Sequence, residues 1–135
     1  MAAADVLLLV ARVLYGSVLA FMGLNHFMQT EAMTGYAQHK GLPAPKLSVL
    51  VSGAVLVFGG LSVVAGVLPV VGAVALAGFL VVSALTMHDF WAVPEDQQQD
   101  EMTGFLKNVA LAGGALAIAA YATTGWAYSV GITLF

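Results

Sequence analysis

The stretch at residues 70–91, VVGAVALAGFLVVSALTMHDFW, decides the fold class of this chain. It carries no ionisable side chain before His88, and roughly 20 apolar helical residues suffice to cross a hydrocarbon core about 30 Å thick. Three further apolar runs of similar length occupy residues 5–28, 47–66 and 104–124. None of the four shows the period of two that marks a lipid-facing barrel strand. We therefore predict four transmembrane helices.

The composition agrees with a multi-pass protein of the cell membrane. Of the 135 residues, 61% are hydrophobic and only 8% are charged, whereas a soluble domain is nearer half apolar and a quarter charged. Four spans and their connections fill residues 1–135, so we predict a single all-α domain: a four-helix transmembrane bundle with short interfacial helices. The start of the chain lacks the positive region of a secretory signal, so we expect the first span to be retained.

Charge and cysteine content exclude several classes of function. The net charge of −3 argues against nucleic-acid binding. The chain has no cysteine, which excludes thiol catalysis and cysteine-ligated iron–sulfur clusters within it.

Two longer connections separate the spans, and each contains a helix signal. In the first, Thr30 can begin a short helix over residues 30–40, and Gly41 followed by Pro43 can end it. In the second, Pro94 suits a first helical position and acidic residues follow it, which predicts a helical piece over residues 94–103 that leads into the fourth span. Four spans place both connections on the same face of the membrane. Three lysines near this face favour a cytoplasmic position, but they leave the orientation open.

Most polar side chains belong to that same face. An ionisable group left alone in lipid is costly, so such groups tend to point inward and to pair. We expect Lys107 to pair with Asp89 or Glu101, which leaves two histidines free for a lipid headgroup or a ring carbonyl. The predicted ligand-binding cluster at this end of the bundle comprises His26, His88, Asp89, Glu101, Lys107 and Asn108, with Tyr36 and Lys40 over them.

These residues allow several interpretations. His26 and His88 end two spans of the same direction. Two such histidines could ligate a haem or, with Asp89 or Glu101, a metal. Their spacing matches no dedicated motif, so we expect neither. A histidine beside a carboxylate at the membrane edge can also donate to a quinone carbonyl and relay its proton. Alternatively, the same residues only close the end of the bundle. No residue is assigned a catalytic role.

Arg12 lies inside the first span, where an arginine is expensive. It can reach back to the interface with its charged end. It can also turn inward to hold a lipid headgroup or a partner acid, and the sequence leaves both alternatives open.

An ordered set of short motifs resembles the DoxX family of four-helix membrane proteins. The residues that carry the resemblance run from Leu8 to about Ala119, and they comprise ARVLYG at 11–16, GLNHF at 23–27, YA at 36–37, KGLPAP at 40–45, SG at 52–53, GGLS at 59–62, MHDFW at 87–91 and EMTGFLKN at 101–108. Two positions depart from the family pattern. Leu56 stands where many relatives carry a glutamate, and His26 stands where many carry a lysine.

The resemblance implies a four-helix bundle associated with quinone-linked oxidoreductases. We therefore expect an accessory subunit of a membrane redox assembly, with membrane lipid, quinone, redox subunits or further copies of the chain as candidate partners. The alternative is a small lipid-binding or assembly protein without a redox role. Family membership alone does not make the chain an enzyme.

Overall fold

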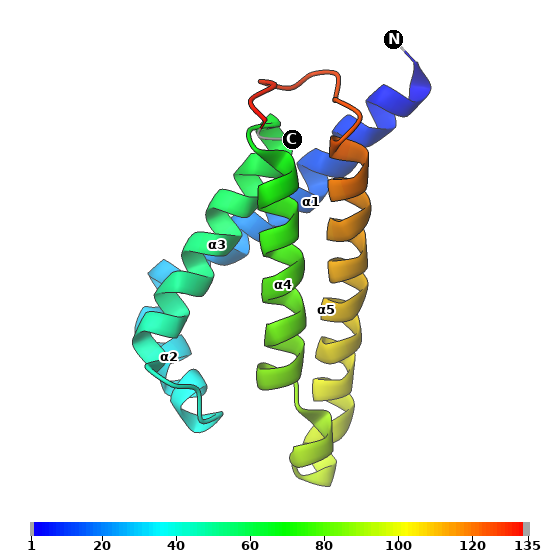
Figure 1. Ribbon diagram of the computed structural model, residues 1–135. Coiled ribbons are helices and arrows are strands. Elements are labelled where there is room, and N and C mark those ends of the chain that lie inside the picture. Colours follow the sequence, from blue (N-terminus) through cyan, green and yellow to red (C-terminus); the bar gives the residue numbers. More distant parts are fainter. Residues whose placement is uncertain (1, 134–135) are drawn as a thin grey trace.

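The computed structural model describes residues 2–133, and it confirms the predicted all-α architecture (Figure 1). Four helices are long and apolar enough to cross a membrane. They are α1 (Ala3–Met28), α3 (Pro45–Ala65), α4 (Pro69–Met87) and α5 (Glu95–Ala122). The short helix α2 (Thr30–His39) follows α1, and a single 3₁₀ turn, η1 (Phe90–Ala92), follows α4.

The helix ends follow local backbone chemistry. Gly41 and Gly66 take positive φ angles of 77° and 74° where α2 and α3 end, which glycine adopts without the steric cost of a Cβ. Proline occupies the first helical position of α3 and of α4, where its missing N–H has no partner in any case. The helical piece predicted at residues 94–103 is the beginning of α5, continuous with the fourth span. The third span ends at Met87 as an α-helix, earlier than predicted, and continues as η1.

Helices α1 and α3 pack at backbone contact through glycines. A Cβ added to Gly23 would lie 2.7 Å from the carbonyl oxygen of Gly53. A Cβ added to Gly16, two helical turns earlier in α1, would likewise meet the carbonyl oxygen of Gly60. Association of helices in lipid depends on such close approach because lipid tails are as apolar as the helix surfaces. The core shared by the four spans is small and aliphatic, and its best buried members are Leu56, Val63, Ala73, Leu76 and Ala115.

The outer surface of the bundle is apolar, as contact with lipid requires. Large hydrophobic side chains are exposed on all four spans, among them Leu14, Phe58, Val82 and Leu116. A soluble protein rarely presents so continuous an apolar surface to water, so the exposure pattern fits four membrane-crossing helices.

The two ends of the bundle differ in character. The beginning of α1 and the segment after α5 lie at one end together with the α3–α4 turn, and α2 and η1 lie at the other (Figure 1). After α5 the chain returns across the first end to the α3–α4 turn, where Ile132 forms an isolated parallel bridge with Val67. The predicted topology, with both longer connections on one face, is the one observed.

Candidate functional site

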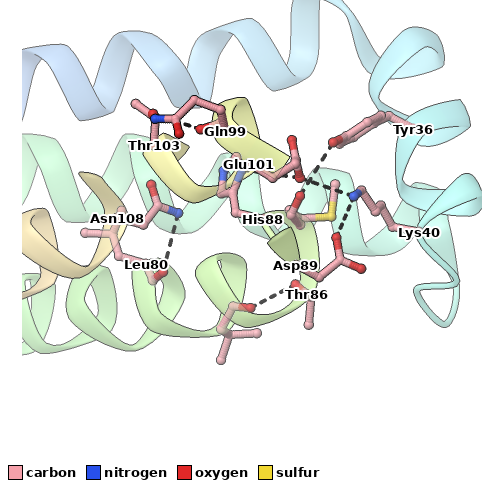
Figure 2. Close-up of polar contacts among 12 residues, drawn as sticks. Tyr36, Lys40, Leu80, Thr86, His88, Asp89, Gln99, Glu101, Thr103 and Asn108 are labelled. Atoms are coloured by element: carbon pink, nitrogen blue, oxygen red, sulfur yellow. Dashed lines mark hydrogen bonds and ion pairs between the residues drawn. The ribbon is translucent and has the colours of Figure 1, made fainter. Parts of the chain in front are cut away.

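Lys40 holds a cluster of polar side chains together at the end of the bundle that carries α2. Its ammonium nitrogen lies 2.6 Å from Asp89 Oδ1 and 3.2 Å from Glu101 Oε2 (Figure 2). These contacts join α2 to the segment after α4 and to the beginning of α5. We call Tyr36, Lys40, His88, Asp89 and Glu101 the edge cluster.

The ion pairs of the edge cluster are partly shielded from solvent. The side chains of Lys40, Glu101 and Asp89 are 8%, 16% and 25% exposed. Exposed ion pairs contribute little, about 0–1 kcal/mol, because water and salt screen them. Partial burial weakens that screening, so the Lys40 contacts should contribute more than a surface pair does.

His88 completes the edge cluster on the side of α5. Its Nδ1 lies 3.9 Å from Glu101 Oε2. This nitrogen is buried and has no hydrogen-bond partner among the described residues. The imidazole packs against Gly104, where an added Cβ would lie 2.8 Å from its Cε1 atom. Gly104 therefore provides the space in which the His88 ring lies.

Electrostatics set the charge state of the cluster at neutral pH. Desolvation lowers the pKa of Lys40, but its hydrogen bonds to Asp89 and Glu101 outweigh that effect and raise the pKa overall. Burial, followed by the negative charge of Glu101, raises the pKa of Tyr36. Lys40 is therefore a cation and Tyr36 a neutral phenol at pH 7. Two acidic side chains, Asp89 and Glu101, therefore face the single ammonium of the cluster.

Tyr36 covers the cluster from α2. The Lys40 ammonium lies 5.6 Å from the centre of the Tyr36 ring, within range of a cation–π attraction. The hydroxyl points to the carbonyl oxygen of Met87 at 3.5 Å, a long contact (Figure 2). Among residues 2–133, no group of three histidine, aspartate or glutamate side chains is placed to hold a metal ion.

The prediction for Lys107 is wrong. Its side chain is exposed on α5 and forms no ion pair within the described part of the chain. Lys40 contacts both carboxylates that were expected to pair with it. Asn108, one residue further on, points toward α4 and donates a long hydrogen bond of 3.4 Å to the carbonyl oxygen of Leu80 (Figure 2). It ties α4 to α5 outside the edge cluster.

His26 also lies apart from the edge cluster, contrary to the prediction. Its ring packs edge-to-face on Phe79 at 6.5 Å, and Phe79 precedes His88 by roughly 13 Å along α4 at 1.5 Å per residue. Helix α1 is inclined to α4 and α5 (Figure 1), and the His26 ring near its end reaches Phe79 in α4. The Nδ1 atom of His26 is buried without a partner among the described residues.

Arg12 forms a second polar site, at the opposite end of the bundle. The residue is fully buried, with 0% exposure, so its charged end is enclosed by protein and does not lie on the surface. Nor does it meet an acid among residues 2–133: its guanidinium donates to four backbone carbonyls and lies 4.5 Å from the centre of the Trp126 ring. The acceptors are Val63 (3.1 Å), Val64 (2.7 Å), Ala127 (2.9 Å) and Tyr128 (3.1 Å).

The position of Arg12 satisfies the end of α3. The last four carbonyls of a helix lack partners within it and carry the partial negative charge of the helix dipole. In α3 all four accept hydrogen bonds, and the donors are the Arg12 side chain and the backbone N–H groups of Gly66, Val67 and Val130. Arg12 therefore joins the end of α3 to the segment after α5. The sequence signals for this site were an arginine inside a span and Trp126 after the last span.

Comparison with known families identifies the chain. A family model described as DoxX matches residues 7–89, which is more than half of the sequence. The chain belongs to the DoxX family. The matched segment runs from α1 to Asp89 and so contains all of the edge cluster except Glu101. The part of the predicted resemblance that lies on α5 is outside it. Comparisons with curated proteins and with solved structures find no match.

Proposed function

We propose that this DoxX protein is an accessory subunit of a membrane oxidoreductase assembly and that its edge cluster contacts quinone. The observation that carries the proposal is the His88 imidazole, which has a buried, unpartnered Nδ1 beside Glu101. Buried polar atoms are nearly always hydrogen-bonded. An unpartnered nitrogen next to an acid therefore suggests a ligand that bonds to it.

The chemistry of the cluster suits a neutral ring with polar substituents. A neutral imidazole can donate a hydrogen bond to a ring carbonyl, and an adjacent carboxylate can take up the proton that a quinol releases. Lys40 holds Glu101 in position for this transfer. The two acidic side chains that face Lys40 disfavour an anionic lipid headgroup, because like charges repel.

The absence of cysteine supports an accessory role. Oxidising or reducing a quinone requires an electron carrier, and this chain contains none of the cysteines that hold iron–sulfur clusters. In the proposed assembly, the redox centre belongs to another subunit and the DoxX chain supplies part of the quinone-contacting surface.

Quinone content of purified protein tests this proposal, and the chain contains a matched control. His39 is exposed near the end of α2, outside the edge cluster. We expect quinone to co-purify with the wild-type protein and with His39→Gln, and to be depleted in His88→Gln. Pull-down from native membranes should recover subunits with redox centres.

The absence of bound quinone would favour the alternative function, a lipid-binding or assembly protein. If quinone does not exceed the level in empty micelles, and if the recovered partners contain no redox protein, the chain is instead a lipid-binding or assembly protein. The observation that favours this alternative is that Lys40 engages both carboxylates, which closes the end of the bundle without a ligand.

A further inference from the structure

A surface groove runs between α3 and α4 at the end of the bundle that carries the chain termini. Its volume is about 610 Å³. Side chains of both helices and of the turn between them line it, including Ala54, Phe58, Leu61, Val67, Val71 and Ala75. The groove is separate from the edge cluster, so what it binds does not depend on the proposed function.

Within residues 2–133, the side chains that line the groove offer a ligand no free hydrogen-bond donor. Among the described residues that line it, Ser62 alone carries a hydroxyl, and this hydroxyl donates to the carbonyl oxygens of Val67 (2.5 Å) and Leu68 (3.0 Å). A quinone ring or a lipid headgroup would lose its hydrogen bonds to water here and gain none, which is costly. The occupant must therefore be hydrocarbon.

The length of the groove matches one leaflet of a bilayer. Along α3 it extends from Ala54 to Ala65, about 16 Å at 1.5 Å per residue. Half of a hydrocarbon core about 30 Å thick is about 15 Å. The groove begins at the α3–α4 turn, where the chain leaves the bilayer, and ends near the middle of both helices.

A second copy of the chain fits the groove less well. A spanning helix would need contact over about 30 Å, twice the length of the groove. Tight helix dimers also place small residues at the points of closest approach. Here Phe58 and Leu61 are lining residues that remain 72% and 51% exposed, and they would hold an incoming helix away.

We propose that the groove binds one acyl chain of a phospholipid from the leaflet on the side of the chain termini. The surrounding bilayer is as apolar as the groove, so the hydrophobic effect does not favour this site. Selection depends instead on the many small van der Waals contacts that a concave surface makes and a flat one does not. Filling the concavity should therefore abolish retention.

Native mass spectrometry of protein released from dioleoyl phosphatidylcholine nanodiscs tests the proposal. We expect one retained phospholipid on the wild type. Ala75→Phe should lower its occupancy ratio roughly tenfold, which corresponds to about 1.4 kcal/mol, because Ala75 is exposed and the new ring fills the groove. Val82→Phe is the matched control: Val82 is 60% exposed on the same helix but lies outside the groove.

Two further measurements check that the filled variant folds and that the retained lipid occupies the groove. Circular dichroism shows whether Ala75→Phe still folds, and Ala75→Leu provides a smaller filling if it does not. A phospholipid with a diazirine in its acyl chain should label peptides from residues 54–75 more than those of α1. Equal retention by the wild type and the filled variants, no retained lipid on the wild type, or a dimer that Ala75→Phe dissociates would each overturn the proposal.

Discussion

Replacing Arg12 by methionine should destabilise the bundle more than any other single change of a charged residue. Methionine keeps the apolar stem of the side chain but removes all four hydrogen bonds to backbone carbonyls. The carbonyls of Val63 and Val64 at the end of α3 then lose their partners in surroundings that water reaches poorly. The segment after α5 loses its attachment at Ala127 and Tyr128.

The magnitude follows from the contacts. A hydrogen bond to a charged group contributes about 1.5–3 kcal/mol, so four contribute roughly 6–12 kcal/mol. Methionine also removes the cost of placing an arginine in apolar surroundings, about 3 kcal/mol on insertion scales. The free energy of unfolding should therefore fall by about 3–9 kcal/mol. The free energy of unfolding of Arg12→Lys should lie between those of the wild type and Arg12→Met, because an ammonium is a cation but lacks the planar, forked donors of a guanidinium.

Unfolding by SDS titration in mixed micelles, followed by circular dichroism, measures this change. Leu14→Met is the matched control, since Leu14 lies in the same helix with its side chain 63% exposed, and it should behave as the wild type. Limited proteolysis after Gly125 should be faster in Arg12→Met. A loss below about 1 kcal/mol, the typical value for an ordinary substitution, together with an unchanged cleavage rate would refute the assigned role of Arg12.

Three further predictions concern packing and the edge cluster. Gly23→Ala should cost about 1–3 kcal/mol of stability, because the new Cβ would lie 2.7 Å from the α3 backbone. Gly113→Ala is the control: an added Cβ meets nothing within 4 Å there, so stability should change by less than about 0.5 kcal/mol. The same SDS titration compares the two variants, and equal effects would contradict the glycine packing of α1 on α3. Lys40→Gln should cost about 1–3 kcal/mol and Lys107→Gln almost nothing, so a reversed order would show that Lys107 holds the acids. The Lys40 contribution should be constant from neutral pH up to its ordinary pKa of 10.5 and should disappear as pH rises through its raised value. A wild-type advantage over Lys40→Gln that persists unchanged to pH 12 would exclude the ammonium as its source.

The spans and the short interfacial helix could be predicted from the sequence because each depends on local chemistry. Apolar length determines which segments can cross a bilayer, and glycine and proline mark the ends of α2 and α3. The DoxX resemblance also depends on residue identity, and the family model confirms it over residues 7–89.

The partners within the two polar sites depend on geometry that residue identity does not encode. Lys40 and Lys107 are both near the acids in the topology, and the path of α2 decides that Lys40 contacts them. The inclination of α1 moves His26 away from His88. The acceptors of Arg12 are backbone carbonyls, which every residue has, so no side chain in the sequence could identify them.

Nuclear magnetic resonance of the histidine side chains tests the proposed quinone contact most directly. The chain has three histidines, so ¹⁵N-labelled histidine gives a simple spectrum that His26→Gln, His39→Gln and His88→Gln assign. On titration of nanodiscs with a short-chain quinone, the His88 resonances should shift and saturate while those of exposed His39 stay unchanged. If His88 does not shift, or if all three histidines shift equally and without saturation, the edge cluster does not bind quinone.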